Sequence, residues 1–201
     1  MYKWIHLGLF GLLKKNLLNG GRKNRTKKRP DNRGKLNERF TSIWDIENKV
    51  SNVGWLEMDA VEKNHQSSCL VLVEQSSKNY FVMKLKNHTA NEVLKKLEEL
   101  VRINGLVGKI KVIITDIGKK FSREMEIFYE TQVYFCDAGS PQQKPLIKYM
   151  NSEFRHWFSK EIDFNNVSQK RINSVVNIIN DKFRPCLNWK KAKEVFLQNI
   201  K

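Results

Sequence analysis

The sequence predicts an α/β domain, a mixed sheet flanked by helices, with a basic arm at its amino-terminal side. Two observations predict the domain: five short runs with strand composition, and stripes of apolar residues at helical spacing between and after them. Hydrophobic residues make up 40% of the chain and aromatic residues 10%, which excludes a wholly disordered protein. The length of 201 residues allows one sizeable domain plus an appendage.

Five segments have the length and composition of strands. They are residues 55–61, 69–74, 80–85, 110–115 and 132–136. The first three follow one another closely, which suits an antiparallel meander. The last two are separated by a helical segment, which suits parallel βαβ pairing.

The first helix has a clear start signal. Thr89 can cap it, Glu92 stands at the capping-box position, and residues from Val93 to Val101 supply its apolar stripe. Further helices are expected over residues 120–130, 143–158, 168–182 and 190–199. The expected order is three strands, a helix, a strand, a helix, a strand and then helices. A ribonuclease-H-like α/β domain has this order of elements.

The positive charge is concentrated near the amino terminus. The chain has 37 Lys and Arg against 21 Asp and Glu, which makes an acidic polymer such as DNA the first partner to consider. Between Lys14 and Arg39, eleven basic residues face two acidic ones among glycines and a proline. We therefore expect an extended arm over 14–52 that binds along the phosphate backbone of DNA, and a core domain over 53–201. The alternative for the arm is a solvated linker. The arm residues expected to contact DNA are Lys14, Lys15, Arg22, Lys23, Arg25, Lys27, Lys28 and Arg29.

The sequence offers no membrane segment. The longest apolar stretch, Trp4 to Leu13, has ten residues, whereas a bilayer needs about 20. Lys14 and Lys15 interrupt it before any signal-peptide cleavage site. We expect a cytoplasmic, nucleoid-associated protein, and three widely spaced cysteines make neither a disulfide framework nor a zinc knuckle.

Several acids fall in or at the ends of predicted strands. Glu57 and Asp59 point to the same face of the first strand, and Asp116 and Asp137 follow the fourth and fifth. Ligands of open α/β sheets collect outside the carboxyl ends of strands, and Mg²⁺ takes oxygen ligands from one or two carboxylates there. The alternative is that an Asp at a strand end turns the chain. His65 follows Asp59 closely enough to reach the same site.

Short sequence motifs, taken in their order along the chain, extend this interpretation. They are Gly54 to Asp59, Lys63 to His65 with Leu70 to Glu74, Val82 to Val93, Thr115 to Phe121, Val133 to Pro141, Asn151 to Val167, and Arg184 to Trp189 with Glu194 to Phe196. In this order they resemble the IS-thirty family of insertion-sequence transposases, whose core is a ribonuclease-H-like domain of the DDE type. The resemblance covers about residues 53–199.

The resemblance implies DNA cutting and joining with Mg²⁺ or Mn²⁺, in which Asp59 and Asp116 are the first two catalytic acids and the metal ligands. Glu57, His65 and Asp137 would lie in a second shell. The position of the third acid falls on Lys148. A lysine there removes a ligand and repels a metal ion, so we expect impaired activity. Glu153 points about 140° away on the helix and cannot simply replace it, whereas Arg155 shares the face of Lys148 and would contact DNA.

The amino terminus gives a further expectation from the resemblance. Residues 2–5 resemble the end of the family's helix-turn-helix region, so we expect residues 1–13 to be a remnant of it in an amino-terminally truncated copy. The open alternatives are a working transposase, acting on DNA ends as a homo-oligomer, and a non-catalytic DNA-binding remnant or regulator of transposition. A basic RNA-binding protein would agree with the positive charge of the chain but not with the ordered sequence motifs.

The basic arm makes a testable prediction. Affinity of the full chain for duplex DNA should fall steeply as salt rises, because each neutralised phosphate releases counterions. Fluorescence anisotropy over a salt series measures this dependence. Affinity that hardly changes with salt would rule out phosphate tracking by the arm.

Overall fold

A computed structural model of the chain describes residues 8, 41–46, 53–63, 67–87, 89–116, 131–137 and 139–200. Contacts divide the chain into two units, Met1–Asn32 and Arg33–Lys201, and the sheet and helices belong to the second. The basic residues from Lys14 to Arg39, His65 and the helix expected over 120–130 lie outside the described residues. No helix among the described residues is long and apolar enough to cross a membrane.

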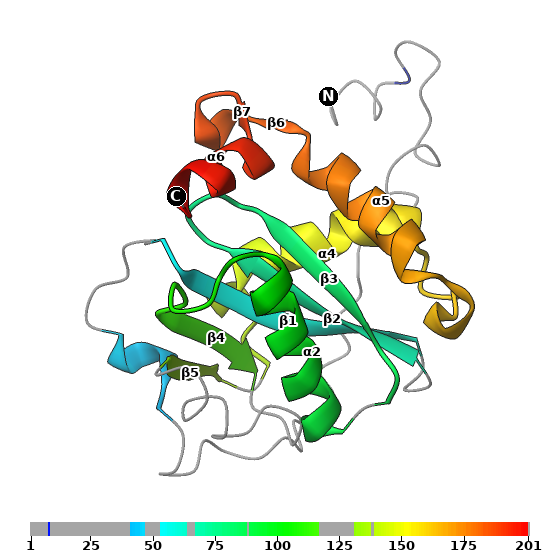
Figure 1. The fold of residues 1–201 in the computed structure, drawn as a ribbon, viewed down its shortest axis with the longest axis horizontal. Helices are drawn as coiled ribbons and strands as arrows, with labels where there is room; N and C mark the ends of the chain where they lie inside the picture. The colour runs from blue at the N-terminus through cyan, green and yellow to red at the C-terminus, as the bar shows by residue number, and fades with distance from the viewer. Residues whose placement is uncertain are drawn as a thin grey trace. The chain divides into compact units, whose positions relative to one another are not determined.

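The sheet confirms the predicted strands and their mixed pairing. Its order is β3-β2-β1-β4-β5, with antiparallel pairing from β1 to β3 and parallel pairing between β1 and β4 and between β4 and β5 (Figure 1). The strands are β1 (Trp55–Lys63), β2 (Ser67–Glu74), β3 (Tyr80–Leu85), β4 (Val112–Asp116) and β5 (Gln132–Cys136). Each lies within two residues of its expected limits at either end.

Four of the expected helices are present in the described residues. They are α2 (Ala90–Ile103), α4 (Pro145–Trp157), α5 (Gln169–Asn180) and α6 (Ala192–Asn199), and the Thr89 side chain caps α2 as expected. A two-stranded hairpin of β6 (Phe183–Arg184) and β7 (Lys190–Lys191) was not expected, because two-residue strands carry no readable alternation. Short 3-10 turns are η4 (Ile43–Asp45), η5 (Pro141–Gln143), η6 (Phe164–Asn166) and η7 (Pro185–Leu187).

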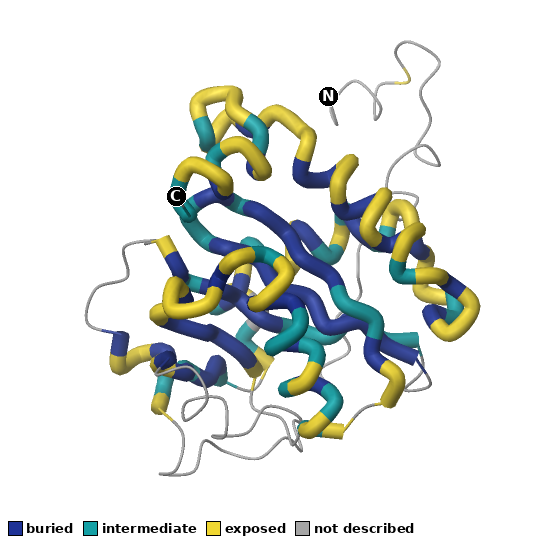
Figure 2. The backbone as a smooth tube through the Cα atoms, in the orientation of Figure 1, coloured by how far each residue is buried: buried dark blue, intermediate teal, exposed yellow. Residues whose placement is uncertain are grey.

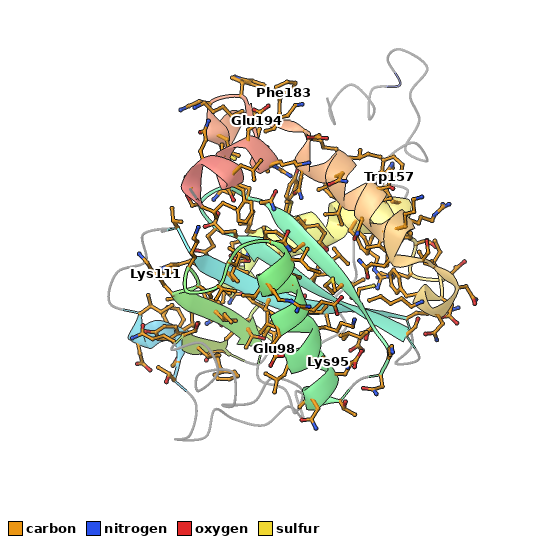
Figure 3. The ribbon with its side chains drawn as sticks, viewed as in Figure 1. Lys95, Glu98, Lys111, Trp157, Phe183 and Glu194 are labelled. Atoms are coloured by element: carbon orange, nitrogen blue, oxygen red, sulfur yellow. The ribbon has the colours of Figure 1, made fainter. Side chains whose placement is uncertain are left out.

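Helices cover both faces of the sheet. Leu56 and Met58 of β1 pack toward α2, which carries Leu97 and Leu100 on its inner side. Cys69 and Val71 of β2 face the other layer, where α4 and α5 pack. In Figure 2 the strands are mostly buried and the outward sides of the helices exposed, and Figure 3 labels Lys95 and Glu98 on α2. The alternation within β1 therefore directs Glu57 and Asp59 toward α4.

Helix α5 closes the outer edge of the sheet with side-chain amides. Asn180 accepts from the Tyr80 N–H at 2.9 Å and donates to the Tyr80 carbonyl at 2.8 Å. Three turns earlier, Gln169 accepts from the Lys84 N–H at 2.8 Å and donates to the Val82 carbonyl at 2.9 Å. These bonds occupy edge groups of β3 that would otherwise invite pairing with another strand.

Gly54 sets the start of β1. Its φ is +86°, and an added Cβ would lie 2.1 Å from the Lys109 carbonyl oxygen. Its own carbonyl accepts from the Lys111 N–H at 2.9 Å, just before β4 begins. Only glycine allows this close approach, which brings the starts of β1 and β4 together.

Replacing Gly54 should therefore destabilise the domain more than a left-handed conformation alone would. Gly105 is the matched control, since its φ is +66° and an added Cβ meets no atom within 4 Å. We expect Gly105→Ala to cost about 1–2 kcal/mol of unfolding free energy. Gly54→Ala should cost about 1–3 kcal/mol more because of the overlap. Urea unfolding measures both, and equal losses would show that the close approach does not matter.

Candidate active site

The parallel pairing of β1 and β4 brings Asp59, in the middle of β1, beside Asp116, the last residue of β4. The parallel pairing aligns Glu57 with Ile114, and the same offset places Asp59 level with Asp116. Both residues stand two positions beyond that pair, so they lie on the face covered by α4. Burial raises the pKa of Asp59, and the negative charge of Asp116 adds to the rise.

Asp59 is held by two donors. Its Oδ1 accepts from the Ala60 N–H at 2.8 Å, and its Oδ2 accepts from Asn151 Nδ2 on α4 at 3.0 Å. The Tyr80 hydroxyl donates in turn to Asn151 Oδ1 at 2.8 Å. Burial raises the pKa of the Asp59 carboxyl above its usual value, while the ammonium of Lys144 is the largest effect opposing this.

Asp116 pairs with a buried lysine. The Lys144 ammonium lies 3.0 Å from Asp116 Oδ2 and donates to the Met58 carbonyl at 2.9 Å. The Lys144 side chain is only 2% exposed, whereas that of Asp116 is 57% exposed. The outer part of the Asp116 carboxylate is thus open to solvent, and its inner part is bound to a cation.

Glu57 connects β1 to the start of α4. Its Oε2 accepts from the Ile147 N–H, the third residue of α4, at 2.8 Å, and its Oε1 accepts from Gln75 Nε2 at 3.1 Å. A carboxylate at this position accepts from a helix N–H that has no partner within the helix, and its charge interacts favourably with the helix dipole. Burial raises the pKa of Glu57, and these hydrogen bonds oppose the rise. Glu57 therefore orients α4 from inside the fold.

Asp137 anchors the turn that precedes α4. Gln143 Nε2 donates to Asp137 Oδ2 at 2.7 Å, while the Asp137 N–H donates to Gln143 Oε1, also at 2.7 Å. Trp44 Nε1 donates to the same carboxylate oxygen at 2.8 Å. This pairing fixes Gln143 on the end of β5, and with it the adjacent Lys144.

Lys148 lies on the exposed side of α4, one turn before Asn151. Its positive charge lowers the pKa of Asp59, so its ammonium belongs to the electrostatic surroundings of the acids. Glu153 pairs with Lys182 and Arg155 donates to the Glu62 carbonyl at 2.6 Å. Neither residue has a recorded contact with Asp59 or Asp116, and the role of Arg155 toward DNA stays a prediction.

The donor set fits a divalent metal only in part. Asp59 and Asp116 supply hard carboxylate oxygens on one face, as Mg²⁺ requires. Among the described residues no group of three or more His, Cys, Asp or Glu side chains could hold a metal.

Three contributors to this site were not singled out from the sequence: Gln143, Lys144 and Asn151. Asn151 could have been found, because it lies three residues after Lys148 and so on the same side of α4. Lys144 had no such signal, since one lysine among many in a basic chain gives no indication of burial.

Comparisons with known proteins agree with this architecture. The chain is 68% identical over its whole length to the candidate integrase ORF3 of Spiroplasma virus SpV1-R8A2 B. It is 28% identical over 98% of its length to the transposase for insertion sequence element IS1086 of Cupriavidus metallidurans. It is 25% identical over 97% of its length to the transposase InsI for IS30A of Escherichia coli. The chain spans 63%, 61% and 51% of these three relatives.

Solved structures identify the fold. The HTLV-2 integrase catalytic core domain, in complex with magnesium, aligns with a TM-score of 0.56 at 17% identity, covering 74% of this chain and 99% of that one. A simian T-cell lymphotropic virus intasome in complex with PP2A regulatory subunit B56 gamma aligns with a TM-score of 0.58 at 16% identity, covering 84% and 61%. No family profile matches the chain. The ribonuclease-H-like fold of integrase cores, expected from the element order, is confirmed.

Burial makes two of the three cysteines unreactive, including Cys136 beside Asp137. Burial raises the pKa of the Cys69 and Cys136 thiols to about 12, whereas Cys186 is exposed. At pH 8 about one buried thiol in ten thousand would be ionised, and the thiolate is the reactive form.

Thiol titration with Ellman's reagent at pH 8 should therefore label one cysteine rapidly in the native chain and all three in denaturant. The variant Cys186→Ser should show no rapid phase. A second rapidly labelled thiol would contradict the packing of the sheet around Cys69 and Cys136.

Proposed function

We propose, since the chain belongs to the IS30-type transposase family, that it acts on DNA in transposition or integration. The chemistry would be phosphoryl transfer dependent on Mg²⁺ or Mn²⁺ that cuts and joins strands at insertion-sequence ends. The observation that carries the proposal is the pair of carboxylates, Asp59 and Asp116, on one face of the sheet where the ladder between the parallel strands β1 and β4 ends. This is where open α/β sheets place their ligands.

The two acids would share the binding of the metal unequally. Asp59 is fixed by Ala60 and Asn151, so it can hold an ion without first being ordered. Asp116 is largely exposed and reaches the side from which a DNA phosphate would approach. When bound, the ion would activate the attacking oxygen and stabilise the charge on the leaving oxygen. Glu57 and Asp137 act on this arrangement only by positioning the turn and helix beside it.

Lys148 makes the activity weak in this proposal. It occupies the position at which the family resemblance expects a third acid, and its ammonium acts on Asp59 through its charge. A cation there opposes a divalent ion and supplies no ligand. We therefore propose that the unaltered chain cuts and joins DNA poorly, if it binds metal at all.

The proposed partner is DNA, both the element ends and the target. The basic residues from Lys14 to Arg29 would hold the phosphate backbone, and Arg155 would add a cation at the end of β1. Phosphate contacts position DNA without reading its sequence, so recognition of particular ends would need other contacts. We also propose that the chain works as a homo-oligomer on paired ends, inside the cytoplasm at the nucleoid.

A second function is favoured by the charge around the acids. Lys144 pairs with Asp116, and the charges of Lys144 and Lys148 act on Asp59, so cations already stand beside both acids. A site of this kind is suited to binding phosphates more than to cutting them. The alternative is therefore a non-catalytic DNA-binding protein that regulates transposition.

Restoring the third acid tests the proposed function. The variant Lys148→Glu should raise Mg²⁺-dependent strand transfer at least about tenfold, a change that corresponds to about 1.4 kcal/mol of transition-state stabilisation. A strand-transfer assay with labelled element ends measures it. Lys170→Glu is the matched control, because it makes the same charge change on an exposed position of α5.

The variant Asp59→Asn in the Lys148→Glu background should remove the gained activity. Strong strand transfer by the unaltered chain would contradict the impairment. No activity in either form would contradict the view that Lys148 is the change that limits catalysis.

A further inference from the structure

Lys144 is buried at the place where β1 and β4 part. The ladder between these strands aligns residues up to Glu57 and Ile114, and Lys144 lies just beyond it. Its ammonium bonds the Met58 carbonyl on β1 and the Asp116 carboxylate on β4. A lysine is almost never this deeply buried without partners, and these two contacts are its compensation. The cation therefore joins the two strands that carry the acids, just beyond the end of their ladder.

The position of Lys144 is set on both sides along the chain. The preceding residue, Gln143, is locked to Asp137 by two hydrogen bonds. Three residues later, the Ile147 N–H is bound by the Glu57 carboxylate. Because the backbone on each side is anchored to the sheet, the Lys144 side chain starts from a fixed point within reach of Met58 and Asp116.

Positive charge is already present beside the acids. Lys144 pairs with Asp116 at 3.0 Å and its charge acts on Asp59 and Glu57, while Lys148 acts on Asp59. Lys144 is the larger of the two cationic influences on the pKa of Asp59. A divalent ion entering between the carboxylates would meet this ammonium at close range, where like charges repel strongly.

From these contacts we infer that Lys144 is an internal counter-ion that holds Asp116 in place without metal and competes with the divalent ion for it. Metal binding requires the ammonium to leave Asp116, so Lys144 sets the affinity of the site for metal. This inference rests on the proposed function, because it assumes that Asp59 and Asp116 are the metal ligands. Lys144 is a positioning residue in this scheme, acting through Asp116.

Metal binding to a lysine variant tests the inference directly. Lys144→Gln removes the charge but keeps an N–H donor for the Met58 carbonyl. Mn²⁺ binding to the full chain, measured by titration calorimetry, should tighten at least about tenfold in this variant. A purely structural role predicts the opposite, because a damaged site binds metal more weakly.

Lys84→Gln is the matched control for lost charge. Lys84 Nζ also donates to backbone carbonyls, those of Asn165 at 2.9 Å and Val167 at 3.1 Å, but no contact with Asp59 or Asp116 is recorded for it. Its substitution should leave Mn²⁺ affinity unchanged. The conservative variant Lys144→Arg should keep the weak binding of the unaltered chain, since it keeps the charge.

Unchanged or weaker Mn²⁺ binding in a folded Lys144→Gln chain would overturn the inference. If that variant does not fold, thermal unfolding of the unaltered chain decides, because a ligand that binds the native state raises the melting temperature. Millimolar Mn²⁺ should leave the melting temperature unchanged, and a rise of several degrees would overturn the inference.

The two proposals fail in different ways. Tighter Mn²⁺ binding by Lys144→Gln supports the role of Lys144 as a counter-ion, whatever the activity of Lys148→Glu. Absence of strand transfer by Lys148→Glu would count against the proposed function alone. Restored strand transfer by Lys148→Glu with unaltered affinity in Lys144→Gln would overturn the counter-ion and leave the proposed function standing.

Discussion

The buried ammonium of Lys144 is the contact on which the candidate site depends, because it satisfies groups from two strands at once. It joins the Met58 carbonyl to the Asp116 carboxylate at the point where the β1–β4 ladder ends. Removing a charged group from water is costly, and only close partners make this burial tolerable. The turn from Asp137 to Lys144 and the start of α4 are arranged so that the ammonium reaches those partners.

This arrangement connects the fold with the chemistry. Glu57 holds the first turn of α4, and Asn151, farther along the same helix, reaches Asp59. A helix anchored at its start by one acid thus positions a donor for the next acid on the same strand. Lys148, between these two contacts, is carried to the site by the same helix. The fold is that of integrase cores, and within it a lysine ammonium already pairs with Asp116.

Much of the fold could be predicted from the sequence, because its signals are local. The composition of β1 and the Thr89 cap of α2 give a strand and a helix start that the structure confirms. The Glu92 half of the expected capping box is not formed, because its carboxylate accepts from the Lys86 N–H instead. Asp59, within its strand, and Asp116, at the end of the neighbouring strand, could be brought together by topology. The internal ion pair of Lys144 could not, because burial of one lysine depends on contacts far apart along the chain. The hydrogen bonds of Gln143 with Asp137 are equally invisible in composition and spacing.

If Lys144 competes with a metal ion, only one of these two cations at a time occupies the inner side of Asp116. Anomalous diffraction from crystals of the unaltered chain, grown without metal and then soaked in Mn²⁺, tests it most directly. Before soaking, the Lys144 ammonium should lie near its present distances of 2.9 Å from Met58 and 3.0 Å from Asp116. After soaking, a Mn²⁺ peak between Asp59 and Asp116 should appear only where Lys144 has left Asp116. A fully occupied Mn²⁺ peak beside an unmoved Lys144 would contradict the account.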